Sequence, residues 1–223
     1  MTLEGRGVLV VGAGSARGRA VALLAAARGA AVVFSVPPGG EARAAEIEGL
    51  AAGRAGSVTA DATREDEAER LFGAAVGRLP RVDVVVSVAP DAPPRRLAET
   101  SLAEWDGAVS RALRGAFFVS RLAVEEFLAH GAGGRLVHVT PLVRPGAPAQ
   151  ALAAASLQAL LSLMRSTAKE YGPRRVASNA VVPVPPDPGG PPRDAVAEAV
   201  LFLASAEASY VNGEALRASC SLP

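Results

Sequence analysis

One stretch near the start of the chain, GVLVVGAGSARGRAVALLAAAR at residues 7–28, constrains the fold more than any other. Its first residues are apolar and mostly β-branched, which predicts a buried strand, and its alanine- and leucine-rich end predicts a helix. Gly12, Gly14 and Gly18 lie at the junction, where glycines let the backbone approach a phosphate group beside the free N–H groups of a helix start. The stretch therefore predicts a nucleotide-binding architecture.

Strand-like and helix-like segments alternate along the rest of the chain. Apolar runs near residues 7–12, 30–35, 56–60, 82–88, 134–140, 174–182 and 214–217 are separated by stretches with a helical period of 3.6. The alternation predicts βαβ units, and Val-rich runs predict strands that helices bury on both faces. We expect a Rossmann-like, doubly wound α/β fold with a seven-stranded parallel sheet, in a single domain over residues 1–223.

The composition argues against several classes of protein. Lys plus Arg number 23 and Asp plus Glu number 22, so no net charge draws the chain to nucleic acid or to an anionic membrane. The apolar runs are far too short to span a bilayer. Cys220 is the only cysteine and no signal-like segment opens the chain, so we expect a cytoplasmic protein. His130 and His138 have no spacing that suits a metal, and His130 is interpreted as a helix-terminal residue.

Six segments share their order and spacing with one protein family: residues 60–63, 82–86, 102–120, 166–183, 202–205 and 210–213. Together with Gly12, Ala16 and Gly18, which fit the pattern G-x-x-x-G-x-G with one substitution, they resemble the short-chain dehydrogenase/reductase family. The resemblance covers nearly the whole chain. It implies the fold of a family whose enzymes reduce carbonyls or oxidise alcohols with a nicotinamide cofactor.

The cofactor contacts that the resemblance implies come from Gly12, Ser15, Arg17, Gly18 and Asp61, of which Asp61 would reach the adenine. Other cofactor-reading positions depart from the family: residues 34–38 carry neither an acid nor a base for the ribose, and residues 87–90 replace Asn-Asn-Ala-Gly. Three arginines either pair with a phosphate or are solvated helix residues: Arg17, Arg19 and Arg43. We therefore expect vestigial contacts, no tightly bound cofactor and at most weak binding of NAD(P).

The positions that carry the family's chemistry are also replaced. By alignment, Ala154 stands for the proton-shuttling tyrosine, Gln158 for the lysine four residues later, Pro141 for a serine and Ala112 for an asparagine. Because Lys169 is the only lysine, Tyr-x-x-x-Lys does not occur anywhere in the chain. A positioned acid or base contributes roughly 10²–10⁴-fold to a rate. Ordinary family chemistry is therefore not expected.

Two further features bear on function. The Pro- and Gly-rich connector, Val184 to Arg193, is shorter than the lid that the family usually closes on its substrate, so the pocket would stay open to water. Apolar stripes mark the predicted helices at residues 102–130 and 154–171. In the family these helices, and the C-terminal strand near residues 214–220, also pack against a second subunit. The expected partner is a catalytic relative or a second copy of this chain.

Two hypotheses follow. In the first, the chain is a non-catalytic subunit that pairs with a catalytic relative in a heteromeric NAD(P)-dependent ketoreductase or alcohol dehydrogenase. Such pairs are known in the family, some of them in antibiotic biosynthesis, and the Arg- and Ala-rich composition is consistent with a bacterial secondary-metabolite pathway. In the second, the pocket performs a cofactor-independent dehydration, isomerisation or cyclisation. A stand-alone reductase is the third and least favoured interpretation.

The second hypothesis depends on side chains other than the family's own. His138 and Thr140 alternate on one face of a strand and lead to its C-terminal end, so they are candidate acid/base groups, with Ser87 and Arg144 as further candidates. The competing interpretation of His138 is a buried, hydrogen-bonded core histidine.

Overall fold

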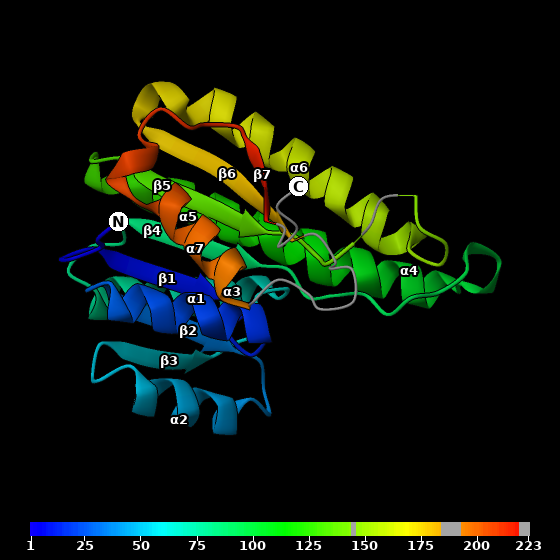
Figure 1. The fold of residues 1–223 in the computed structure, drawn as a ribbon, viewed down its shortest axis with the longest axis horizontal. Coiled ribbons are helices and arrows are strands. Elements are labelled where there is room, and N and C mark those ends of the chain that lie inside the picture. Colours follow the sequence, from blue (N-terminus) through cyan, green and yellow to red (C-terminus); the bar gives the residue numbers. More distant parts are fainter. Residues whose placement is uncertain (144–145, 184–192, 219–223) are drawn as a thin grey trace.

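The computed structural model describes residues 1–143, 146–183 and 193–218, which form one parallel sheet (Figure 1). Its strand order is β3-β2-β1-β4-β5-β6-β7. The strands are β1 (Gly7–Val11), β2 (Ala31–Val36), β3 (Ala55–Thr59), β4 (Val84–Val88), β5 (Gly134–Val139), β6 (Val176–Pro183) and β7 (Ala215–Ala218). Each strand lies within two residues of a predicted run, so the prediction of a doubly wound, seven-stranded parallel sheet is confirmed.

Helices cover both faces of this sheet. They are α1 (Ala16–Ala27), α2 (Glu41–Leu50), α3 (Glu65–Arg78), α4 (Leu102–Val109), α5 (Gly115–His130), α6 (Ala151–Tyr171) and α7 (Arg193–Ala204). The alternation along β1 shows how the core is divided: Val8 and Val10 pack with α1, α2 and α7, whereas Leu9 and Val11 pack with α3 and α5. This burial on both faces explains why the strands consist of continuous valine runs.

The predicted helix at residues 102–130 is interrupted rather than continuous. A π-helical turn, Ser110–Arg114, separates α4 from α5. Figure 1 shows α4 and the first turns of α6 extending beyond the carboxyl ends of the strands. Because π-helical turns are rare and frequently lie at functional sites, this interruption directs attention to the carboxyl edge of the sheet.

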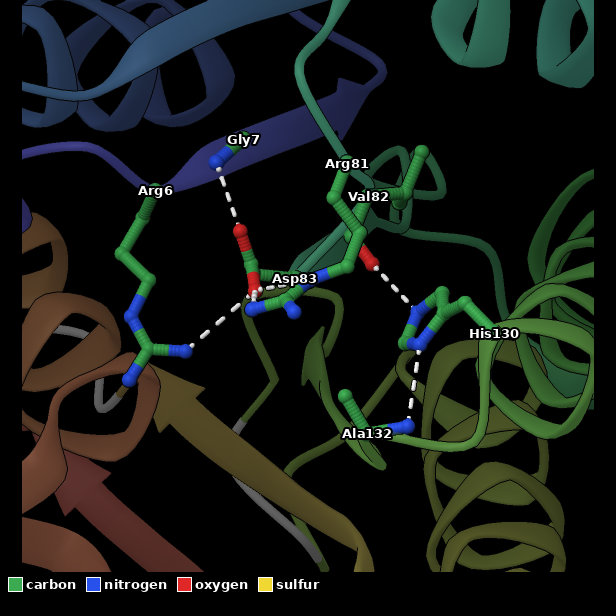
Figure 2. Close-up of polar contacts among 7 residues, drawn as sticks. All are labelled: Arg6, Gly7, Arg81, Val82, Asp83, His130 and Ala132. Carbon is green, nitrogen blue, oxygen red and sulfur yellow. Dashed lines mark hydrogen bonds and ion pairs between the residues drawn. The ribbon is translucent and has the colours of Figure 1, made fainter.

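Polar side chains at the opposite, amino edge of the sheet are paired with one another (Figure 2). Buried Asp83 accepts a hydrogen bond from the Gly7 N–H at 3.0 Å and forms ion pairs with Arg6 and Arg81. These contacts hold the start of β1 against the start of β4.

His130 is likewise satisfied, as the last residue of α5, which confirms its interpretation as a helix-terminal residue. Its Nε2 lies 3.2 Å from the Val82 carbonyl oxygen, and the Ala132 N–H donates to its Nδ1. Within the described ranges, no group of three His, Cys, Asp or Glu side chains is arranged to hold a metal. Over the same residues, no helix combines the length and apolar character needed to cross a membrane.

Candidate functional site

The turn between β1 and α1 is built by its glycines and by Ser15. The Ser15 hydroxyl donates to the Gly12 carbonyl oxygen at 3.0 Å and accepts from the Gly18 N–H at 3.1 Å, which caps the helix. Gly12 has a φ of +93°, and a Cβ on Gly18 would lie 2.3 Å from the Gly12 oxygen. The N–H groups of Ala16 and Arg17 form no hydrogen bond to another described residue. This helix start therefore offers free donors to an anion.

A cavity of about 300 Å³ opens beside this turn, at the carboxyl ends of β1 to β4. Its wall is largely apolar, which suits a planar ring, and it includes Ala112 of the π-helical turn and Gly115 at the start of α5. Six polar residues line it, from several elements: Ser15, Ser35, Asp61, Thr63, Ser87 and Arg111. The cavity therefore combines a flat apolar slot with a few polar groups and an anion-binding helix start.

Asp61, directly beyond β3, is held in place by its neighbours. Its Oδ1 accepts hydrogen bonds from the Thr63 N–H at 3.0 Å and the Thr63 hydroxyl at 2.8 Å. Its own N–H donates to Glu67 at 2.7 Å. No described residue donates to Oδ2, so this oxygen is free to accept from a ligand in the cavity. The geometry is consistent with the predicted contact to an adenine amine, which stays a prediction.

The predicted cofactor residues do not all line the cavity. Gly12, Ser15 and Asp61 do, whereas Gly18 supports the turn from behind. Arg17 points elsewhere: its Nη1 and Nη2 form ion-paired hydrogen bonds of 2.9 and 2.7 Å with Asp91.

The other two arginines proposed for phosphate binding also have carboxylate partners. Arg19 and Arg43 both pair with Glu46, at 2.7 and 2.8 Å. Of the two interpretations given to them, that of surface helix residues fits their contacts better. A phosphate at the turn would have to displace Asp91 from Arg17 instead.

Sequence reasoning missed two polar residues of the cavity. Ser35 accepts a hydrogen bond from the Gly12 N–H at 3.0 Å, and its signal was a lone hydroxyl within the valine-rich second strand. Arg111 lines the cavity from the π-helical turn and forms no ion pair with a described residue. Its only signal was its place directly before Ala112, the position that the resemblance assigns to an asparagine. Arg111 is therefore an uncompensated positive charge at the mouth of the cavity.

The four positions that correspond to the family's chemistry lie at the same carboxyl edge. Ala112 is buried in the π-helical turn and lines the cavity, and Pro141 follows β5. Ala154 and Gln158 lie in the first two turns of α6, the first half-buried and the second exposed. None of these four side chains is ionisable, so none of them transfers a proton.

His138 and Thr140 are both fully buried and line neither the cavity at the glycine turn nor the smaller cavity beside Asp91. Burial lowers the pKa of His138 from 6.5 to about 4, so the ring is neutral at pH 7. Neither ring nitrogen has a hydrogen-bond partner among the described residues. The interpretation as a buried core histidine therefore fits, but the hydrogen bond that this interpretation included is not found. The Thr140 hydroxyl donates to the Pro141 carbonyl oxygen at 3.3 Å.

Three parts of the sequence-based predictions lie outside the described residues. They are residues 184–192 of the connector, the candidate residue Arg144, and Cys220 at the end of the predicted C-terminal strand. Ser87, the remaining candidate group of the second hypothesis, lines the cavity at the end of β4.

Comparison with known proteins identifies the family. Residues 12–188 match a family model described as enoyl-(acyl carrier protein) reductase. The 3-oxoacyl-[acyl-carrier-protein] reductase of Thermotoga maritima is 29% identical over 97% of each chain. The L-rhamnose 1-dehydrogenase (NAD(P)(+)) of Azotobacter vinelandii is 32% identical over 97% of this chain and 96% of its own. The chain belongs to the short-chain dehydrogenase/reductase family.

One solved structure of a similar chain corrects the prediction about the cofactor. The 3-ketoacyl-(acyl-carrier-protein) reductase of Brucella melitensis, complexed with NADH, has a TM-score of 0.89, 27% identity and 97% coverage of both chains. The expectation that this short-chain dehydrogenase/reductase has no tightly bound cofactor is therefore wrong. It relied on the missing charges of residues 34–38, yet those replacements leave the cavity open and the glycine turn intact.

Proposed function

We propose that this chain binds an NAD(P)-type dinucleotide at the carboxyl edge of its sheet and serves in an oxidoreductase whose proton transfer depends on a catalytic relative. One observation carries the proposal. The cavity keeps the capped glycine turn and Asp61, whereas Ala112, Pro141, Ala154 and Gln158 provide no acid or base. Nucleotide-binding geometry and proton-transfer chemistry are thus separated in this protein.

The residues present fit such a nucleotide. The free N–H groups of Ala16 and Arg17 would hold the diphosphate, and the Asp61 Oδ2 would accept from the adenine amine. Arg111 adds a positive charge at the cavity. The bound nicotinamide would supply a hydride to, or accept one from, a carbon atom. NADH in the Brucella reductase and the NAD(P)(+) of the Azotobacter dehydrogenase support this cofactor class.

Ketone reduction also needs a proton at the carbonyl oxygen. Ser87 has a neutral hydroxyl of high pKa, and Thr140 is buried with its hydroxyl already engaged. His138 is neutral and enclosed, so it has no path to a substrate. Loss of a positioned proton donor lowers a rate by roughly 10²–10⁴-fold. We therefore assign proton transfer to another subunit.

An exposed apolar surface on α4 and α5 supports a partner. Leu102, Trp105 and Phe117 are large apolar side chains that are 74%, 40% and 47% exposed. Beside Phe117 a groove of about 730 Å³ runs between the π-helical turn and α6, where Leu113 and Leu163 line it. Large exposed apolar side chains near such a groove are typical of interaction sites in soluble proteins. We propose that a catalytic relative, or a second copy of this chain, covers this surface.

The alternative of a cofactor-independent reaction at His138 and Thr140 is not favoured. Both side chains are fully buried, and neither lines the cavity at the glycine turn. A general acid or base must lie within hydrogen-bond reach of the atom that it protonates or deprotonates. The antibiotic-pathway assignment likewise stays a proposal that depends on composition and resemblance.

The purified chain tests the proposal directly. Calorimetry with NADH and NADPH should give saturable binding, while a panel of ketones should give no ketone-dependent oxidation of either nucleotide. Native mass spectrometry of the protein from its own host should show a second reductase chain. As a control variant, Arg19→Ala removes an arginine that pairs with Glu46, and its affinity for NADH and NADPH should equal that of the wild type. Turnover of ketones by the pure protein would contradict the separation of binding from proton transfer.

A further inference from the structure

The pair Arg17 and Asp91 spans the point of the sheet where ligands of this architecture bind. In the strand order, β1 lies between β2 and β4, so the chain leaves β1 toward one side of the sheet and leaves β4 toward the other. Open α/β sheets bind their ligands in the crevice at such a switch point, beyond the carboxyl ends of the strands. Arg17 follows β1 and Asp91 follows β4, so their ion pair crosses this crevice.

The contact, which we name the Arg17–Asp91 bridge, ties three loops together. Both guanidinium Nη atoms donate to the carboxylate, and Nη2 also lies 3.4 Å from the Ala89 carbonyl oxygen. The Asp91 Oδ1 additionally accepts from the Leu142 N–H at 2.7 Å, in the loop after β5. The loops after β1, β4 and β5 are thereby closed over the crevice.

The bridge is asymmetric in its exposure to solvent. The Arg17 side chain is 14% exposed, whereas that of Asp91 is 49% exposed. The Arg17 Nε is buried and has no hydrogen-bond partner among the described residues. A buried donor without an acceptor is unfavourable, so Arg17 is not satisfied by Asp91 alone. Asp91, in contrast, is rehydrated easily if the two side chains separate.

The loop that carries Asp91 lies between two hollows, since Ala89 and Pro90 line the first and Asp91 lines the second. On one side lies the cavity of about 300 Å³ with Gly12, Asp61 and Arg111 in its wall. On the other side lies a smaller cavity of about 200 Å³, lined by Asp91 and by Ala153 on the first turn of α6. Ala153 directly precedes Ala154, the position of the family's tyrosine. We expect an adenosine to occupy the first cavity, whereas a dinucleotide must extend past the bridge toward the second.

We infer that Arg17 is a specificity-determining residue that exchanges Asp91 for the diphosphate of an entering dinucleotide, and that this exchange joins the two cavities. The inference rests on the proposed function and names the group on which the site discriminates. A guanidinium pairs with phosphate oxygens through the same planar, two-point geometry that it uses with a carboxylate. Asp91 therefore acts as a built-in competitor for the ligand's phosphates, and a nucleoside confined to the first cavity leaves the bridge intact.

Opposite substitutions in the bridge should have opposite effects on the dinucleotide. Asp91→Asn removes the competing charge, so the affinity for NADH should rise about tenfold. Arg17→Gln removes the phosphate partner, so the affinity for NADH should fall about tenfold. Adenosine, which has no phosphate group, is the probe of the first cavity and should bind each variant within about twofold of the wild type, because the lost charged contact does not involve it. Isothermal titration calorimetry measures the affinities of the wild type and of both variants for each ligand.

Glu46→Gln is the matched control, because it converts the carboxylate that faces Arg19 and Arg43 to an amide without touching the crevice. It should leave both affinities unchanged. Thermal melts establish that each variant is folded. An unchanged ratio of NADH to adenosine affinity in Asp91→Asn, or a shift of the same sign in both bridge variants, overturns this inference alone. Absence of nucleotide binding in every variant and in the wild type overturns the proposed function, and the inference with it.

Discussion

The two edges of the sheet differ in whether their polar side chains have partners within the protein. At the amino edge, Asp83 is buried against Arg6 and Arg81, and both ring nitrogens of His130 have partners (Figure 2). At the carboxyl edge, Asp61 keeps an oxygen without a partner among the described residues. Asp83, Arg6 and Arg81 also line a cavity, of about 410 Å³, but they bind one another there. The difference is therefore that the second edge leaves polar groups unpaired at its cavity.

This difference separates residues that stabilise the fold from residues that are available to a ligand. Buried polar groups are normally paired, so a group at a cavity without a partner indicates what the cavity accepts. Substitutions at the amino edge should therefore change stability and leave nucleotide affinity unchanged, while those at the carboxyl edge should do the reverse. The comparison fails if either edge affects both quantities to the same extent.

The largest expected effect concerns His138, the buried counterpart of the paired His130. Its pKa is about 4 in the folded chain and 6.5 in the unfolded one, so the unfolded state binds the proton first. The stability that this neutral ring contributes is complete above pH 6.5 and is lost as the pH falls toward 4, by about 3 kcal/mol. Urea unfolding of the wild type and of His138→Leu, compared between pH 7 and 4, measures it. Equal pH dependence in both proteins would refute the assignment.

Asp83 should give the next largest effect. Asp83→Ala leaves the Gly7 N–H without its acceptor and removes the carboxylate from Arg6 and Arg81, which are about half exposed and regain water. The free energy of unfolding should fall by about 2 kcal/mol, less than for a fully buried ion pair. Urea denaturation measures the loss, and calorimetry with NADH on the folded variant should show wild-type affinity.

A carboxylate at the protein surface provides the control for Asp83. Asp66 pairs with Arg64 at 3.3 Å, but both side chains are more than 60% exposed. Asp66→Ala should lower the free energy of unfolding by no more than about 0.5 kcal/mol. If the two variants lose equal stability, the buried network of Figure 2 does not hold β1 against β4 in the way argued above.

Much of this fold is predictable from the sequence because its signals are local. A run such as Val84–Val88 is long enough and apolar enough to require burial on both faces, and the glycines after Val11 require a tight turn. Asp61 follows β3 and lines the cavity, but its contact with the adenine was implied by the family resemblance and stays a prediction. The register of α5 was not predictable, because one π-helical turn shifts every side chain before it.

The sequence does not indicate which side chains far apart in the chain will pair with each other. Arg17 was expected to bind a phosphate or solvent, and it pairs with Asp91, 74 residues further along the chain. The expectation about the cofactor was wrong for a related reason, because missing charges were taken as a missing site. The volume of a cavity depends on how four strand ends and a helix meet, and no single motif records it.

The smallest expected effect concerns Arg111, which the π-helical turn brings to the nucleotide cavity. Arg111→Gln removes a positive charge near an anionic ligand, so the dissociation constant for NADH should rise about three- to fivefold, and less at high salt. Arg114→Gln is the matched control, since Arg114 belongs to the same turn and lines the groove beside α6 instead. Stability should change little in either variant, because both arginines are exposed. Equal weakening by both would show that only overall charge matters, and the carboxyl edge would then lose one of its ligand-directed groups.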